Sequence, residues 1–245
     1  MLPSRNKAEA LRVYLSATQL CPALASSLPV VGLEGGASAE QCARWLQQTA
    51  AQLSGKPLQV QLCGALTTIF CMPFSAAMDT PAAVQRMAGG YARHALGDVA
   101  PSDYVVIEPL SYGQPALILG LDPSLANLAS NQRLQRMEPY AIAAWNRYCN
   151  ALTEHCWLAV VEPATITLLY KHGVCIHDVF IRRLAPASNS VAAIQALIRQ
   201  QFHRPADAAY LIDEFGLIPV GEPLGSLERL SPTQPVFSFV ANKPS

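Results

Sequence analysis

Six side chains of types that bind metal ions or transfer protons are predicted to lie near one another in the second half of the chain: Cys149, His155, Cys156, Cys175, His177 and Asp178. Cysteine and histidine are the usual protein ligands of zinc, and the strands expected to carry these residues are neighbours, so a zinc site is one interpretation. In the other interpretation the thiols only fill apolar positions of the strands. We favour the second, because Cys156 and Cys175 lie in apolar strand contexts, and no two cysteines of the chain have the C-x-x-C spacing of a zinc knuckle.

The stretch around Glu162 predicts three short strands joined by two turns. Residues 157–182 read WLAVVEPATITLLYKHGVCIHDVFIR, in which apolar and β-branched runs flank the turn Glu162-Pro163-Ala164-Thr165 and a second turn at Gly173. A helix over 190–202, a strand over 208–213, a Gly/Pro-rich loop and a last strand over 235–240 are expected to follow. This half of the chain therefore predicts a layer of strands and helices.

The first half shows a similar alternation. The expected strands cover 11–16, 28–33, 58–64, 67–74, 104–110 and 115–121, and the expected helices cover 38–53, about 80–97, 122–136 and 140–152. The order of three strands, helix, strand, helix and strand can be drawn imperfectly in both halves, and it is the layout of the ribonuclease-H-like α/β layer. We therefore predict an α/β fold of two such lobes, with mixed sheets flanked by helices.

Composition excludes several classes of protein. The 245 residues include 17 Lys plus Arg and 17 Asp plus Glu, so there is no charge excess that would bind nucleic acid or an anionic membrane. No secretory signal and no apolar run of about 20 residues is visible. Seven scattered cysteines are typical of a reducing compartment. We expect a soluble cytoplasmic protein, and the segment 236–240 is a place where a longer protein could continue toward a membrane helix.

The sequence resembles the actin-like ATPase superfamily, and within it the PilM and GspL group of type IV pilus and type II secretion proteins. The resemblance is carried by WLAVVEPATITLLYKHGVCIHDVFIRRL, by LTTIFCMPF with the helix ending YARHALG, by EPYAIAAWNRY, and by AAYLIDEFGLIPVGEPLGSLERLSP. It implies a first actin-like lobe with an inserted subdomain over 1–152 and a second lobe over 153–245. In this family ATP and magnesium lie in the cleft between the lobes.

The resemblance also implies where the nucleotide would bind, at Ser16 and Thr18 in the first hairpin, at Glu162 and Thr165 in the second, and at Gly216 in the adenine loop. The family needs an acidic residue in the first hairpin, a D-x-G-type turn in the second and a glycine pair near the adenine. Here the first hairpin has no carboxylate, and in the second turn Pro163 removes an amide donor. The adenine loop reads Asp-Glu-Phe-Gly and lacks the glycine pair. We expect degenerate positions with no catalytic residue and no cofactor, although residual ATP and magnesium binding is left open.

The family implies partners of the same kind. We expect a non-catalytic scaffold, peripheral to the bacterial inner membrane, that docks the secretion or pilus assembly ATPase and inner-membrane assembly proteins, and a homodimer is left open. One alternative is an active actin-like ATPase or nucleotide-binding protein that uses Glu162. Another is a small-molecule enzyme of unrelated α/β fold.

Overall fold

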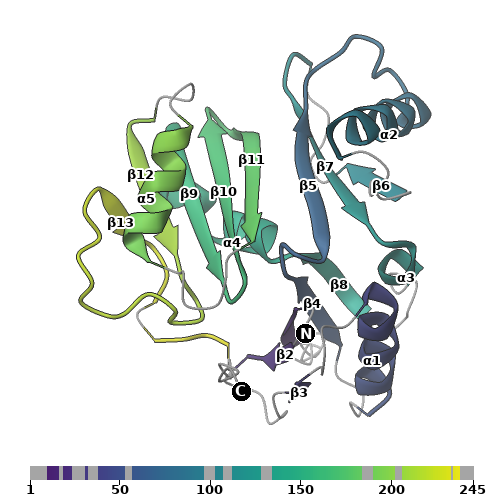
Figure 1. The fold of residues 1–245 in the computed structure, drawn as a ribbon. Coiled ribbons are helices and arrows are strands. Elements are labelled where there is room, and N and C mark those ends of the chain that lie inside the picture. The colour runs from purple at the N-terminus through teal and green to yellow at the C-terminus, as the bar shows by residue number, and fades with distance from the viewer. Residues whose placement is uncertain are drawn as a thin grey trace, which may run out of the picture.

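Two five-stranded sheets of the same topology form the two lobes (Figure 1). The computed structural model describes residues 10–16, 19–23, 31–32, 38–52, 57–96, 103–106, 112–127, 134–183, 190–201, 206–232 and 234–237. The first sheet has the order β3-β2-β1-β4-β8 and consists of β1 (Leu11–Leu15), β2 (Gln19–Pro22), β3 (Val31–Gly32), β4 (Leu58–Leu62) and β8 (Leu134–Pro139). The second has the order β11-β10-β9-β12-β13 and consists of β9 (His155–Glu162), β10 (Thr165–His172), β11 (Cys175–Arg183), β12 (Ala208–Ile212) and β13 (Leu227–Arg229).

Strand directions also correspond between the lobes. Strand β1 pairs antiparallel with β2 and parallel with β4. In the same way, β9 pairs antiparallel with β10 and parallel with β12. Helix α1 (Ala39–Gln52) joins β3 to β4, and helix α5 (Val191–Gln200) joins β11 to β12 at the equivalent place. The α/β prediction of two lobes with mixed sheets flanked by helices is therefore confirmed.

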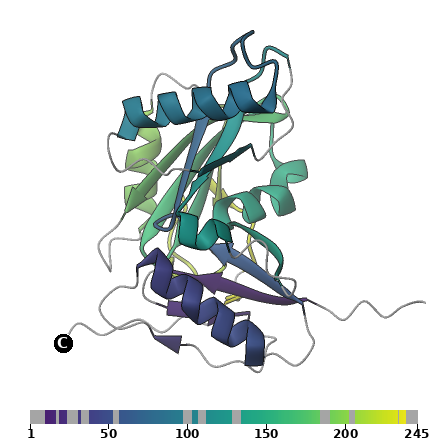
Figure 2. The ribbon, with the colours of Figure 1, turned by 90° about the vertical axis from the view of Figure 1, so that its right-hand side faces the viewer.

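A smaller sheet with its own helix is inserted in the first lobe. Strands β5 (Thr67–Met72), β6 (Asp103–Val106) and β7 (Ala116–Leu121) pair in the order β5-β7-β6, and all pairs are antiparallel. Helix α2 (Pro81–Leu96) lies across this sheet (Figure 2). Val84, Ala88 and Ala92 of the helix belong to an apolar cluster with residues of the sheet. We call these elements the inserted subdomain.

The alternation of side chains along β9 explains its continuous apolar sequence. Cys156, Leu158 and Val160 belong to an apolar cluster that also contains residues of the first sheet and of helix α4 (Tyr140–Tyr148). The opposite face of the sheet packs against α5, where Ile194 is fully buried. Because successive side chains of a strand point to opposite faces, a strand covered on both sides must be apolar throughout. The two lobes thus share one core.

Several predicted elements were wrong. The helix expected over 122–136 ends early, since α3 covers only Pro123–Ala126 and Leu134–Pro139 form β8, which pairs in parallel with β4. Tertiary pairing overrides the local helical pattern there. Strands β2 and β13 were not predicted, and of the strand expected over 235–240 the described part makes one bridge, between Phe237 and Ala23.

The remaining helical predictions agree with the structure in position. Helix α4 begins directly after Pro139 and is followed by a 3-10 turn, Cys149–Ala151, before the predicted lobe boundary at 152. Helix α5 is capped by Ser190, whose side chain accepts a hydrogen bond from the Ala193 amide. Across the described parts of the chain, no helix has both the length and the apolar character needed to cross a membrane.

Candidate functional site

The predicted nucleotide-binding positions fall at the strand ends that face the junction of the two lobes. Ser16 directly follows β1, Glu162 ends β9, Thr165 begins β10, and Gly216 lies in the loop after β12. Thr18 lies outside the described residues. The Ser16 hydroxyl is engaged in its own turn, because its oxygen accepts from the Gln19 amide at 2.9 Å and donates to the Gln19 carbonyl at 3.0 Å.

Glu162 is fully buried and joins the two lobes through hydrogen bonds. Its Oε2 accepts from the Tyr14 hydroxyl at 2.9 Å and from the Gly64 amide at 3.1 Å, and both donors belong to the first lobe. The Thr167 hydroxyl, on the second sheet, lies 3.4 Å from Oε1. Burial raises the pKa of the Glu162 carboxyl to about 7, although these hydrogen bonds oppose the shift. We call Glu162, Tyr14 and Gly64 the interlobe latch.

The backbone at Gly64 passes close to its neighbours in the latch. A Cβ atom there would lie 3.2 Å from Glu162 Oε1 and 3.2 Å from Ile181 Cγ2, which is closer than such contacts normally are. It would also lie 3.3 Å from Thr165 Oγ1. The Thr165 hydroxyl is buried beside Glu162, yet it has no partner of good hydrogen-bond geometry among the described residues.

The two carboxylates of the loop after β12 interact with other groups of the protein. Asp213 accepts hydrogen bonds from the Leu217 and Ile218 amides at 3.0 and 2.8 Å, and so holds the loop closed. Glu214 is fully buried, forms an ion pair with Arg147 and accepts from the hydroxyls of Tyr140 and Tyr148, both at 3.2 Å. The carboxylate of Glu214 thus fastens helix α4 to the second lobe.

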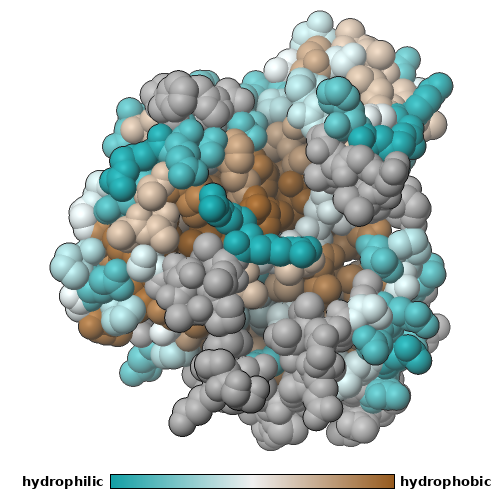
Figure 3. All heavy atoms as spheres, in the orientation of Figure 1, coloured by the Kyte–Doolittle hydropathy of each residue, from teal (hydrophilic) through white to brown (hydrophobic). Residues whose placement is uncertain are grey.

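Phe215 lies between the lobes, at the centre of an aromatic cluster. Its ring lies 4.6 Å from the ring of Tyr14, 5.3 Å from Tyr140 and 5.3 Å from Phe237, measured between centroids. The next residue, Gly216, has φ of +69°, a conformation that favours glycine. In the space-filling view apolar residues gather in the hollow between the two lobes (Figure 3).

The predicted nucleotide positions are occupied by contacts between the two lobes. The Glu162 oxygens accept hydrogen bonds from Tyr14, Gly64 and Thr167, and the described part of the first hairpin offers Ser16 in place of a carboxylate. The ring of Phe215 packs against Tyr14 and α4. Binding a triphosphate at these positions would require several of the contacts to break.

The six candidate zinc ligands lie on neighbouring elements, as expected, but do not converge. Cys156 is buried in β9, whereas Cys149 lies in the 3-10 turn and Cys175 begins β11. Imidazole rings form a row across three strands, with ring centroids 4.5 Å apart for His155 and His172 and 4.9 Å apart for His172 and His177. Within the described ranges, no three His, Cys, Asp or Glu side chains are arranged to hold a metal ion.

Sequence reasoning identified Glu162 but missed its partners. Tyr14 reads as an ordinary strand residue, and Gly64 reads as part of a turn. Tyr14 and Glu162 are 148 positions apart, so no local pattern links them. The only available signal was the presence of an acidic residue at the end of an apolar strand, where an unpaired charge would be costly.

Replacing Glu162 with glutamine should remove a pH dependence of stability. The pKa is about 7 in the folded protein and 4.5 in the reference state, so the folded chain keeps a proton that the unfolded chain loses between these values. The stabilisation is complete below about pH 4.5 and is lost as pH rises toward 7, by roughly 3 kcal/mol at most. Urea unfolding at pH 5 and pH 8 measures this change in the free energy of unfolding. Wild type should lose more free energy of unfolding than Glu162→Gln across this interval, and equal losses would contradict the assignment.

Replacing Gly64 with alanine should destabilise the protein by about 1–3 kcal/mol, because the added methyl group is forced against Glu162 and Ile181. Gly90 gives a matched control, since it lies within α2 and a Cβ there meets nothing within 4 Å. Gly90→Ala should stabilise by about 0.5–1 kcal/mol through helix propensity. Chemical denaturation measures the free energy of unfolding of the two variants. A Gly64→Ala protein as stable as Gly90→Ala would contradict close packing at the latch.

Comparisons with known proteins identify the fold. No protein-family model matches the sequence, and no curated protein sequence matches it. Among solved structures, the chain is similar to a Bacteroides thetaiotaomicron VPI-5482 protein of actin-like ATPase fold and unknown function, with a TM-score of 0.53, 13% identity, and 86% of this chain and 85% of that chain covered. It is also similar to a chain of the PilM-PilN type IV pilus biogenesis complex, with a TM-score of 0.56, 14% identity and coverage of 91% and 88%.

The cytoplasmic domain of EpsL, an inner membrane component of the type II secretion system of Vibrio cholerae, aligns with a TM-score of 0.47, 13% identity and coverage of 92% of this chain and 86% of that one. The first two similarities exceed the level at which a shared fold is evident. The chain therefore has an actin-like ATPase fold, as the sequence resemblance implied.

Proposed function

We propose that the protein is a non-hydrolysing actin-like scaffold that docks an assembly ATPase and inner-membrane proteins of a type IV pilus or type II secretion machine. The observation that carries this proposal is the interlobe latch, in which the acidic residue of the second hairpin is bonded to Tyr14 and Gly64 of the opposite lobe. A magnesium ion or its waters would have to compete with Tyr14 and Gly64 for this carboxylate.

The choice of machine is supported by the likeness to the PilM-PilN structure, which covers most of both chains. That structure is a complex of type IV pilus biogenesis proteins, so an actin-like chain of this size serves there as a component of an assembly. As part of the same proposal, the protein would lie on the cytoplasmic side of the bacterial inner membrane, as the sequence resemblance implies. The balanced charge of the chain gives no support to nucleic acid as a partner.

A rigid body is what such a scaffold needs. The apolar cluster shared by the two sheets, the buried Glu214 with its three partners and the rings around Phe215 all resist relative motion of the lobes. Nucleotide-driven opening would have to break these contacts together. The surfaces of the two lobes can therefore be presented to partners in one fixed arrangement.

Nucleotide titration tests the non-hydrolysing part of the proposal. A fluorescent ATP analogue with magnesium should show no saturable binding at micromolar concentration, and phosphate release should equal that of buffer. Tyr14→Phe removes one of the two hydrogen bonds to Glu162 Oε2 while keeping the ring, and it serves as the comparison variant. Micromolar binding with turnover in wild type, abolished by Glu162→Gln, would favour the alternative of an active ATPase.

Complementation in the source organism tests the scaffold part. Cells that lack the protein should lose pilus assembly or type II secretion, and Glu162→Gln should restore it to at least half of the wild-type level, because glutamine keeps the shape of the latch. Co-purification with the assembly ATPase, identified by mass spectrometry, provides the direct readout. Normal pilus assembly and secretion in the deletion strain would contradict the proposal.

A further inference from the structure

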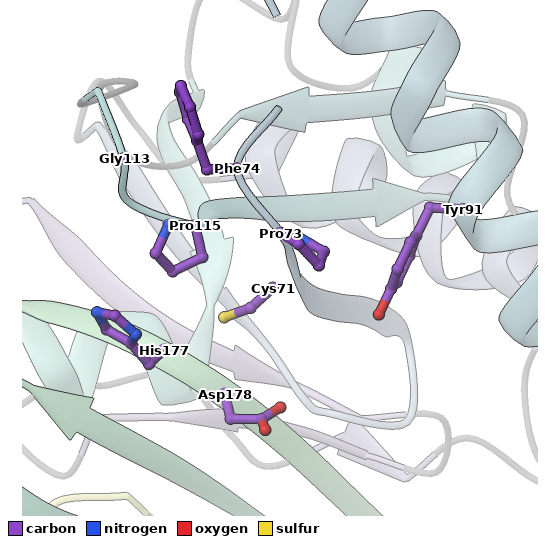
Figure 4. Close-up of a pocket in the computed structure, with 8 residues that line it drawn as sticks. All are labelled: Cys71, Pro73, Phe74, Tyr91, Gly113, Pro115, His177 and Asp178. Atoms are coloured by element: carbon purple, nitrogen blue, oxygen red, sulfur yellow. The ribbon is translucent and has the colours of Figure 1, made fainter. Parts of the chain in front are cut away.

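Exposed aromatic side chains are concentrated on the inserted subdomain. Of the five large hydrophobic residues that are exposed in the described parts of the chain, three are Phe74, Tyr91 and Tyr112. Phe74 and Tyr91 line a hollow of about 320 Å³ beside β11, and the ring of Tyr91 points from α2 into it (Figure 4). Tyr91 stacks on Phe70 with centroids 5.4 Å apart, and Phe74 meets Tyr112 at 4.9 Å. Exposed rings gathered in this way are typical of an interaction site.

Helix α2 places a basic face beside the ring of Tyr91. Arg86, Gly90, Arg93 and His94 are exposed, and we call these four residues the basic face of α2. At about 100° per residue, the exposed positions follow one another around the helix from Arg93 and Arg86 through Gly90 and His94 to Tyr91. The sequence of the helix contains no aspartate or glutamate. Positive charge and an exposed ring therefore share one side of α2.

The charge of the two arginines is not balanced by neighbours within the described parts of the chain. None of the ion pairs formed between residues that the structure describes includes Arg86 or Arg93. The nearest acidic residue along the described chain, Asp79, lies before the first turn of the helix. Because the whole chain has as many acidic as basic residues, this positive face is a local feature, and it is complementary to carboxylates of a partner.

The spacing of the arginines matches that of side chains on a second helix. Arg86 and Arg93 are seven residues apart, which is about 10.5 Å along a helix axis, and Gly90 lies between them. A Cβ atom at Gly90 would meet nothing within 4 Å, so the surface between the arginines has room for a side chain of a partner. Two carboxylates seven positions apart on a partner helix have the same separation. In Figure 2 no other described element covers the outer side of α2.

A protein fits this face better than a membrane surface. Helices that lie on membranes bury their apolar side in the bilayer. The apolar side of α2 is already used, because Val84, Ala88 and Ala92 belong to the cluster formed with the sheet. Two arginines alone attract an anionic lipid surface only weakly, since stable binding of this kind needs a larger group of basic residues.

We propose that the basic face of α2 docks an acidic helix of a partner protein, whose carboxylates pair with Arg86 and Arg93 while an apolar side chain lies over Gly90. Further apolar residues along the flank of that helix would contact the rings of Tyr91 and Phe74. The proposal deepens the docking role given above, and it rests on that role in assigning the acidic helix to a partner protein.

Titration with model peptides tests the docking face. The probe is a fluorescein-labelled, alanine-based peptide of about 20 residues, long enough to form a helix. It carries two glutamates seven positions apart with a leucine midway between them, and a control peptide has glutamine in place of both glutamates. By fluorescence anisotropy, the glutamate peptide should bind with a dissociation constant on the order of 0.1–1 mM, and the glutamine peptide about tenfold more weakly. High salt should remove most of this difference, because exposed charges are screened.

Matched variants locate the binding on α2. Arg86→Gln and Arg93→Gln should each weaken binding of the glutamate peptide about fivefold, which corresponds to about 1 kcal/mol. Gly90→Leu should weaken it to a similar extent, because leucine occupies the space between the arginines where a Cβ atom meets no other part of the protein. Arg199→Gln is the control, since Arg199 is an exposed arginine on α5 of the other lobe. It should leave binding within about twofold of wild type.

Three results would overturn the proposal. The first two are equal binding of the two peptides and unchanged binding in both arginine variants. The third is co-sedimentation of the wild type with phosphatidylserine vesicles that is lost in Arg86→Gln, which would assign the face to a membrane instead. Any of these results, obtained while co-purification of the assembly ATPase is intact, would contradict the docking face but leave the scaffold function standing.

Discussion

The hydrogen bond between Tyr14 and Glu162 is the contact on which the arrangement of the lobes depends. A buried carboxyl group is unfavourable in its charged form, and its raised pKa reflects that cost. Two donors from the first lobe offset the cost only while the lobes remain together. Separation of the lobes would expose the aromatic cluster around Phe215 at the same time, so polar and apolar contacts favour the same closed state.

The same geometry explains how the two lobes of this fold can be held together without a ligand between them. The fold places the ends of β1 and β9 opposite each other, so the residues at those ends meet whether or not a ligand lies between them. In this chain a tyrosine, a glutamate and a glycine meet directly. In the proposed non-hydrolysing role, the acidic side chain that could serve a metal would instead stabilise the junction, so the fold would persist without nucleotide.

The fold could be predicted from sequence where a local pattern was strong. The three strands of residues 157–182 were predicted because long apolar runs are separated by turn residues, and α5 was placed because Ser190 precedes an apolar stripe. Strand β8 was mistaken for helix because its identity depends on pairing with β4, about 75 residues earlier. Strand β13 has only three residues and gives no signal of its own.

The candidate sites were harder to predict from the sequence than the fold. Glu162 could be singled out, but its bond to Tyr14 spans 148 positions and the close approach of the backbone at Gly64 is visible only in three dimensions. The side of α2 that is exposed depends on how the helix packs on β5 and β7, and the order of those strands in their sheet is not visible in the sequence. Contacts between distant segments decide both sites, and a single sequence does not contain that information in readable form.

Hydrogen exchange at the Gly64 amide tests the closed junction most directly. Its N–H donates to Glu162 while the lobes are closed, so exchange should be strongly slowed, and millimolar magnesium ATP should change neither the exchange rate nor the chemical shift of this amide. Fast exchange in the free protein, or a saturable change on adding the nucleotide, would show that the cleft opens and that Glu162 can reach a ligand.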